Sequence, residues 1–454
     1  MEARASFLAI AAIVMSATSG VARAADDEPI FRKISIDAAI TVGTLRPLSG
    51  VQAATGADGA AFYKAAHIDL VRIDAALGAG ADSIFPDLAA DSDNPKSYNF
   101  GPTDRIIASI KSAGAEPLLR IACEPAAAGS ELDLERYAQI ARHMALHYNK
   151  GWGKGFKYAV RYWEIGNEPD LQRSWSGTAL DYYALYDKMA RAIQSADDQA
   201  LVGGPGLAKP LLAGAYRENF IDVVRANRLP LDFFSWHFFA VDSNDPYVFV
   251  SIARELRRIL DAHGSGSTKN ILDEWNVDPA TEDMSKAARA AFATSALIYM
   301  LGGPIDAQTV DARAMPDEVA HALSAFGALK STPILIKTLG GDDAGFALAA
   351  GRSQDRRLVQ ILISNYQIAP KFLQPRNNWD TSLPERRTLH YHDNAGYDAA
   401  INLPSSGKYQ VNRYRIDDHS NFTLVDKSVQ TGPSVHLQAP LPPPGVELIV
   451  ISAN

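Results

Sequence analysis

Cysteine is almost absent from this sequence, since Cys123 is the single one among 454 residues. One thiol cannot form an internal disulfide, so stability must come from the size of the hydrophobic core. Runs of lysine or arginine are missing too, and the net charge is −8. Because binding of nucleic-acid phosphates requires a basic face, we expect no nucleic-acid partner. Past the first 24 residues, no apolar run is long enough to suggest a membrane span.

Several ligand-binding motifs are also missing. The chain has no glycine-rich nucleotide turn after its first predicted strand, and no P-loop, G-x-S-x-G, H-E-x-x-H or C-x-x-C motif. Four histidines outside the predicted barrel strands lack the spacing from acidic residues that is typical of a metal site. These are His263, His321, His390 and His392. We therefore expect neither a metal nor an organic cofactor.

The N-terminus has the order of a secretory signal. Arg4 precedes an apolar run over residues 7–14, and small residues follow up to Ala24. A charged segment, an apolar segment and an A-x-A site in this order predict cleavage after Ala24. We expect a signal peptide over residues 1–24 and a mature protein that is periplasmic or secreted, without membrane insertion. Glu2 weakens the charged segment, so an uncleaved anchor is the alternative.

Between residues 25 and 340, short apolar runs alternate with amphipathic segments of helical length. This alternation is typical of an α/β fold with parallel strands. Eight strands favour a (β/α)8 TIM barrel over an open doubly wound sheet. The predicted strands are 36–43, 70–75, 116–122, 160–166, 200–204, 231–237, 270–274 and 307–310.

Beyond residue 340 the pattern changes to short strand-like runs separated by Gly, Pro, Asn and Asp. These runs predict an appended C-terminal antiparallel β-sandwich over residues 341–454. A polar insertion at 376–396 is predicted to be a loop of the sandwich, with a lip at the barrel mouth as the alternative. The predicted strands are 346–350, 358–364, 409–416, 435–437 and 446–451.

Two of the predicted barrel strands end in carboxylates. The fourth ends in the sequence WEIGNEPD, which contains Asn167 and Glu168, and the seventh ends in LDEWN, which contains Glu274. Functional groups of a TIM barrel lie at the C-terminal ends of its strands, so both carboxylates should face one mouth. The fourth and seventh strands lie across the lumen from each other, which allows the two side chains to converge.

Two carboxyl groups are suited to acetal cleavage, because one can protonate the leaving oxygen and the other can stabilise the developing oxocarbenium ion. We expect partial burial in its turn to raise the pKa of Glu168, which would then serve as general acid and base. Glu274, kept anionic by hydrogen bonds or a nearby cation, would be the nucleophile. A separation of roughly 5–5.5 Å gives retention and a wider one inversion.

These residues resemble a known family. Asn-Glu-Pro on the fourth strand and Glu-Trp-Asn ending the seventh are similar to the clan of retaining (β/α)8 glycoside hydrolases. Within that clan the two motifs look most like family 39, which includes β-xylosidases and α-L-iduronidases. The resemblance implies that Asn167 bonds the sugar 2-hydroxyl beside the nucleophile. It also implies that His237, at the end of the sixth strand, lines the site; a core histidine is the alternative.

Other residues at the predicted mouth are candidates for substrate contacts. Asp74 and Glu124 end the second and third strands and could bind sugar hydroxyls. Trp275 and Trp175 could each offer an aromatic face to a pyranose, or pack against the barrel instead. Asp74 departs from the family pattern, as does Phe239, which leaves the substrate open.

Glu164 is expected to be structural. It alternates onto the same face as Glu168 but deeper in the lumen, where a buried charge needs a partner. Arg72 and Arg120 on neighbouring strands are the candidates. The sequence as a whole predicts a retaining glycoside hydrolase, exo-acting and xylosidase-like or related. The alternatives are an endo-acting polysaccharide hydrolase of the same fold and a non-catalytic carbohydrate-binding barrel.

Overall fold

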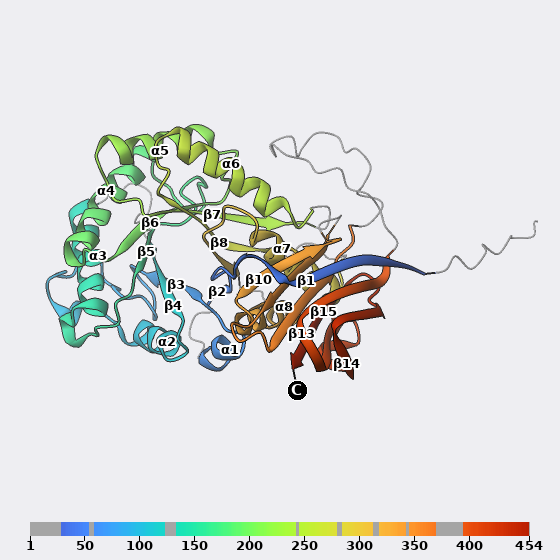
Figure 1. Cartoon of the computed structure of the whole chain (residues 1–454). Coiled ribbons are helices and arrows are strands. Elements are labelled where there is room, and N and C mark those ends of the chain that lie inside the picture. Colours follow the sequence, from blue (N-terminus) through green and yellow to red (C-terminus); the bar gives the residue numbers. More distant parts are fainter. Residues whose placement is uncertain are drawn as a thin grey trace, which may run out of the picture.

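The computed structural model describes residues 29–53, 59–122, 133–241, 245–278, 284–311, 317–341, 345–368 and 394–453. Figure 1 shows a barrel ringed by helices and, beside it, a layer of long strands that contains the C-terminus. The predicted signal peptide, Glu124 and residues 376–393 of the polar insertion lie outside the described residues. None of the described helices combines the length and the apolar character needed to cross a membrane.

In the described chain, eight parallel strands close into a barrel that runs in order from β2 to β9. The predicted TIM barrel is thereby confirmed. The fourth, sixth and seventh predicted strands keep those positions, as β5, β7 and β8. The strand bounds are β2 Gly50–Gln52, β3 Leu70–Ala76, β4 Glu116–Ala122, β5 Tyr162–Ile165, β6 Leu201–Leu207, β7 Phe233–Ala240, β8 Lys269–Val277 and β9 Ala307–Asp311.

Helices alternate with these strands and form the outer ring of the barrel (Figure 1). Side chains set where several of them begin. Thr178 and Asp181, for example, form a reciprocal capping box at the start of α4. The helix bounds are α1 Ala60–Ala65, α2 Gly101–Ser112, α3 Leu134–Asn149, α4 Ala179–Ala196, α5 Gly214–Ala226, α6 Val248–Ala262, α7 Lys286–Met300 and α8 Asp317–Ala328, with short 3-10 turns at Pro95–Ser97, Trp152–Lys154 and Leu329–Ser331.

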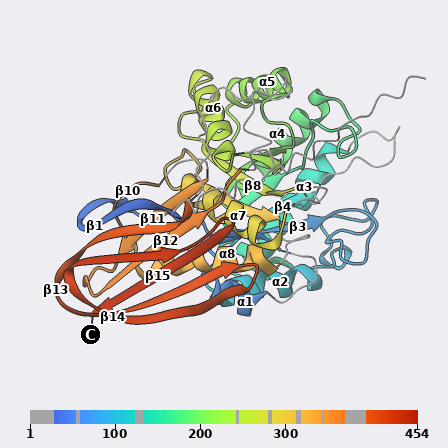
Figure 2. The same ribbon diagram turned by 90° about the vertical axis from the view of Figure 1, so that its right-hand side faces the viewer.

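A second sheet forms the strand-rich C-terminal domain, in the order β1-β10-β11-β12-β15-β13-β14. Strand β1 also pairs with β13, so the sheet curls around and its first strand meets a strand near its other end. This pairing is parallel, whereas the other pairings of the sheet are antiparallel. Figure 2 shows these long strands in front of the barrel. The bounds are β1 Ile30–Thr44, β10 Ile334–Leu339, β11 Phe346–Arg352, β12 Leu358–Asn365, β13 Asn394–Asp417, β14 Ser420–Pro440 and β15 Gly445–Ala453.

The prediction of the first barrel strand was wrong. Residues 36–43 lie in β1, which pairs with β10 and β13, and the barrel begins instead at β2. An apolar run identifies a strand but not the sheet it joins, and β2, with three residues, is too short to give such a run. Strands β1 and β10 precede residue 341, so the predicted domain boundary does not coincide with the division between the sheets.

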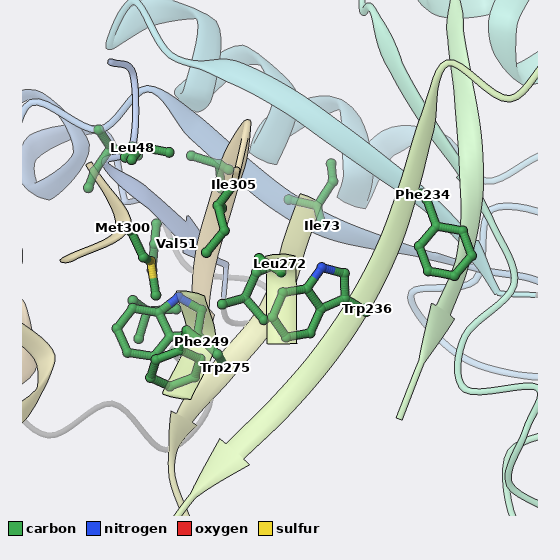
Figure 3. Close-up of a cluster of buried hydrophobic side chains, with 14 of the residues drawn as sticks. Leu48, Val51, Ile73, Phe234, Trp236, Phe249, Leu272, Trp275, Met300 and Ile305 are labelled. Carbon is green, nitrogen blue, oxygen red and sulfur yellow. The ribbon is translucent and has the colours of Figure 1, made fainter. Parts of the chain in front are cut away.

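The barrel and the second sheet pack through α7. Ser295 on α7 donates a hydrogen bond to the carbonyl of Gly345 at 2.7 Å, and Ser364 of β12 donates to the carbonyl of Ala291 at 2.8 Å. The rings of Phe292 and Tyr366 meet edge to face, 5.3 Å apart. The core of the barrel itself lies between strands and helices, as Figure 3 shows for large side chains of β7, β8 and α6.

Candidate active site

The turn after β5 places Glu168 by means of an uncommon backbone conformation. Glu168 has φ +48°, in the left-handed region, where a residue with a β-carbon is strained by about 1–3 kcal/mol. Its N–H donates to the carbonyl of Gly206 at 2.9 Å. A β-carbon on Gly206 would lie 2.9 Å from Glu164 Oε1, so only glycine lets the two strand ends approach this closely. The turn is therefore held by the adjacent strand end.

A register shift in β8 brings two neighbouring carboxyl groups to the same side. Adjacent strand residues normally face opposite sides of a sheet. Here Trp236 pairs with Leu272 but His237 pairs with Glu274, so Asp273 is an extra residue in the ladder. A bulge of this kind re-aims side chains. As a result Asp273 and Glu274 both approach the same arginine.

That arginine is Arg72 of β3, which is fully buried. Its Nε–H donates to Glu164 Oε2 at 2.8 Å, and Nη1 donates to Glu274 Oε2 at 2.8 Å. Its Nη2 donates to Asn167 Oδ1 at 3.0 Å, and Nε lies 3.2 Å from Asp273 Oδ2. The guanidinium of this β3 residue thus contacts side chains of β5, of the turn after β5 and of β8.

The charges in this cluster divide unequally. Burial opposes the charge of Arg72, but the facing carboxyl groups, Glu164 first, raise its pKa well above the ordinary value. Burial also raises the pKa of Glu164, yet the charge of Arg72 first, and then the neighbouring Asp273, bring it down to about 2. The pKa of Asp273 is raised well above its ordinary value, first by burial and then by Glu164. Arg72 and the burial of the cluster therefore shift the pKa values of these two carboxyl groups in opposite directions.

Glu168 is surrounded by donors. His237 Nδ1 lies 3.2 Å from Oε1, and Oε2 accepts from Ser174 Oγ at 3.2 Å and Arg173 Nη2 at 3.3 Å. Burial raises the pKa of Glu168, but the bond and charge of His237, and then Arg173, lower it to about 2. The expected rise of this pKa was wrong, because a partly buried carboxylate with three donors is stabilised as the anion.

A cavity of about 640 Å³ opens beside these residues. Glu168 and Glu274 both line it, so the described structure brings the two predicted carboxylates to one space. Asn167 and His237 line it as well, which agrees with their predicted place in the site. The remaining lining residues are Leu171, Gln172, Arg173, Ala208, Lys209, Phe238 and Phe239.

Similarity to known proteins agrees with this geometry. Residues 25–259 match the model of glycosyl hydrolases family 39. A glucosidase from Croceicoccus marinus is similar over 94% of this chain and 100% of that chain, with 32% identity and a TM-score of 0.85. The chain belongs to glycosyl hydrolase family 39. It is therefore a glycoside hydrolase with a carbohydrate substrate, and the predicted resemblance to family 39 is confirmed.

More distant relatives of this family 39 chain share its fold. A family 39 enzyme from Xanthomonas axonopodis pv. citri is similar over 96% of this chain and 100% of that chain, with 15% identity and a TM-score of 0.71. A β-xylosidase from Geobacillus stearothermophilus is 26% identical over 171 residues, which is 34% of this chain. The match spans only about a third, 33%, of that relative.

The two predicted tryptophan platforms of the family 39 chain do not reach the cavity. Trp275 is 1% exposed, its indole N–H donates to Gln308, and its ring packs on Phe249 of α6 at 4.8 Å. Figure 3 shows the two rings side by side. Trp175 is 5% exposed and donates to the carbonyl of Thr178 at 3.0 Å. Both side chains therefore pack inside the fold, which is the alternative that the sequence left open.

Two predicted sugar contacts stand apart from the cavity or outside the described chain. Asp74 forms an ion pair with Arg120 at 2.7 Å and does not line the cavity, so its predicted contact is not supported. Glu124 lies outside the described residues. The pairing also settles the partner of Glu164, which is Arg72 and not Arg120. Glu164 is fully buried, as expected for a structural charge.

Sequence reasoning missed Asp273, Arg173 and Ser174 as members of the site. Asp273 precedes Glu274, and strand alternation placed it on the opposite face, so only the bulge reveals it. Arg173 and Ser174 follow the Asn-Glu-Pro turn closely in the sequence, a signal that could have been used.

Atoms of Glu164, His237 and Asp273 that are able to bind a metal lie within 4.8 Å of one another. Because Arg72 already faces this group, a cation is supplied by the protein itself.

Proposed function

We propose that this family 39 chain is a retaining glycosidase in which Glu274 is the nucleophile and Glu168 the acid/base residue. The observation that carries the proposal is that both carboxylates line one cavity but contact different partners. Glu274 faces a buried, permanently charged guanidinium, which favours the anion that attack requires. Glu168 faces His237, whose Nδ1 lies 3.2 Å from Glu168 Oε1.

The proposed reaction has two steps. Glu274 attacks the anomeric carbon while Glu168 protonates the leaving oxygen, and the glycosidic bond breaks. Glu168, now a carboxylate, takes a proton from water as the water displaces Glu274 from the anomeric carbon. Asn167 supports this arrangement, because Arg72 engages its amide oxygen and the amide nitrogen makes no hydrogen bond within the described chain. That nitrogen is thus available to a substrate hydroxyl beside Glu274.

We propose exo-action on a short or terminal glycoside, as the second part of the same function. The cavity volume of about 640 Å³ is in the range of small-molecule sites. Phe238 and Phe239 are the aromatic residues that line it, fewer than a long polysaccharide cleft would require. A β-xylosidase among the relatives makes xylosides a first choice of substrate. Endo-action remains the competing assignment, whereas family membership sets the non-catalytic alternative aside.

The test follows the product as it forms. A panel of chromogenic xylosides, glucosides, arabinosides, galactosides and uronides identifies the glycone, and proton NMR then records the first-formed anomer. We expect the anomeric configuration of the substrate in the product, and a covalent adduct on Glu274 with a 2-deoxy-2-fluoro glycoside of the active sugar. Initial formation of the opposite anomer would exclude the double displacement. Rapid shortening of polymers without release of monosaccharide would exclude exo-action.

Export is the remaining proposal, and the order of the first 24 residues supports it. Expression of the full chain in a Gram-negative host, followed by fractionation and N-terminal sequencing, tests it. We expect a periplasmic or secreted protein that begins at Ala25. A full-length protein retained in the membrane fraction would favour the uncleaved anchor.

A further inference from the structure

Asp273 is a buried carboxyl group without a donor of its own. It is fully buried, and neither Oδ1 nor Oδ2 makes a hydrogen bond of normal geometry in the described structure. Arg72 Nε lies 3.2 Å from Oδ2, but its N–H donates to Glu164 at 2.8 Å instead. Leaving a buried carboxylate unpaired is costly, and protonation avoids that cost. The geometry by itself thus favours a neutral Asp273.

The charges that surround Asp273 point the same way. Arg72 of β3 is the cation, and it faces Glu164 from β5 and Glu274 from β8 as well as Asp273 itself. One positive charge offsets three carboxylates poorly when Arg72, Glu164 and Asp273 are all fully buried. A proton on Asp273 removes one of the three negative charges, and burial and Glu164 indeed raise the pKa of Asp273.

His237 connects this proton to the cavity. Its Nε2 lies 3.5 Å from Asp273 Oδ1, and its Nδ1 lies 3.2 Å from Glu168 Oε1. Nε2 also lies 3.4 Å from Arg72 Nη2, and the imidazole is 1% exposed. Within the described structure, the charged groups near the ring are therefore Glu168 at Nδ1, Asp273 and Arg72 at Nε2, and Glu164, which has a carboxylate oxygen within 4.8 Å of a ring nitrogen.

We propose that Asp273 stores the proton that Glu168 donates, and that His237 relays it between them. This inference rests on the proposed role of Glu168. Asp273 Oδ–H gives its proton to His237 Nε2, and His237 Nδ1–H gives its own to Glu168 Oε1. Asp273 becomes a carboxylate beside Arg72, Glu168 becomes the acid, and the imidazole changes tautomer without a change of charge. The relay gives a source of protons to an acid/base residue whose pKa is lowered to about 2.

Asp273 acts through His237, so it is a positioning residue. Its variant must distinguish a loss of proton supply from a loss of structure. Asp273→Asn keeps the shape and neutrality of the acid but cannot release a proton. On a glycoside with a poor leaving group we expect kcat/KM to fall about 10²-fold, with the alkaline limb of the pH profile moved to lower pH. On an activated aryl glycoside, which needs no proton, we expect little change. Equal losses on both substrates, or no loss on either, would overturn the relay.

Asp197→Asn is the matched control. Asp197 is also buried, but it is ionised, because Lys150 at 3.0 Å and Asn149 at 2.7 Å bind its carboxylate and outweigh the burial that opposes its charge. It lies outside the site, so its variant should leave the ratio of activities on the two substrates unchanged. A similar change of that ratio in both variants would overturn the assignment to Asp273.

A second measurement does not depend on substrate or on the proposed function. Infrared spectra at neutral pH should show the carbonyl stretch of a protonated carboxylic acid in the wild-type protein. We expect this band to be lost in Asp273→Asn and kept in Asp197→Asn. A band that survives in Asp273→Asn would overturn the proton store, even if glycosidase activity is found. A lost band with no glycosidase activity would leave the store standing and contradict the proposed function instead.

Discussion

Two buried charge clusters of this molecule are built in opposite ways. In the C-terminal sheet, Glu447 is fully buried and is bound by two cations, with Arg415 at 2.6 Å and Arg413 at 3.4 Å, and by the Tyr397 hydroxyl. In the barrel, one cation, Arg72, faces three carboxyl groups. The first cluster gives its buried carboxylate two cations, one of which also binds Asp426 at 3.3 Å, whereas the second shares one cation among three carboxyl groups.

The difference separates a structural charge from a functional one. Glu447 is bound by two guanidinium groups, and it does not line the cavity that holds Glu168 and Glu274. The barrel cluster keeps an uncompensated acid and stands at the wall of a cavity, through Glu274 and His237. Unbalanced buried charge tends to gather at functional sites, because catalysis needs groups that change protonation. We expect substitutions in the two clusters to affect different quantities.

Glu274→Gln should have the largest effect, and it should be on activity. Without the nucleophile we expect kcat to fall by about 10⁴-fold or more. The free energy of unfolding should change by only about 1 kcal/mol, because Arg72 keeps other carboxyl partners. Initial rates and chemical denaturation test both halves. Azide should restore turnover of an activated glycoside by Glu274→Ala with inverted configuration, and activity without azide would contradict the role of Glu274.

Glu447→Gln should have the reverse effect, with a large loss of stability and no loss of activity. Removal of the carboxylate leaves Arg413 and Arg415 without their shared buried partner, which we expect to cost about 3–5 kcal/mol of stability. The kcat of the protein that remains folded should match the wild type, since the site lies in the other domain. A denaturation midpoint equal to that of the wild type would mean that this cluster is not the structural one.

Glu168→Gln should discriminate between leaving groups. On a poor leaving group we expect kcat/KM to fall by about 10²-fold, because Gln cannot give a proton. On an activated glycoside the first step should be nearly unaffected. A series of aryl glycosides with increasing leaving-group pKa measures this slope. The same slope in the variant and the wild type would remove Glu168 from the acid role.

Arg173→Ala should have the smallest effect. Its side chain is 76% exposed and lies 3.3 Å from Glu168, so solvent screens the pair. The pKa of Glu168, about 2 against an ordinary 4.5, should rise slightly. Since this pKa is lowered by folding, its stabilising effect exists above about 4.5 and is lost as the pH falls toward about 2. Arg173→Ala should weaken that acid dependence, measured by unfolding between those pH values, and a steeper dependence would contradict it.

Periodicity was sufficient for the barrel because long parallel strands are apolar on both faces. It failed where a strand was short, as with β2, or where pairing is remote in sequence, as with β1. In the site, Glu168 and Glu274 could be predicted because strand ends converge in a barrel. Asp273 could not, because a bulge breaks the alternation on which the prediction relied. The pKa of Glu168 could not either, since Arg173 and Ser174 join it only through the folded turn.

Strand β1 also sets the order in which the molecule can be completed. Its residues pair with β10 and with β13, so the earliest described strand waits for partners made roughly 300 and 360 residues later. The C-terminal sheet therefore cannot close while the chain is still being synthesised, and contacts of such long range slow folding. A fragment that ends at residue 340 would leave an open strand edge, which is a template for aggregation. The barrel and the second sheet should therefore be expressed together, as one chain.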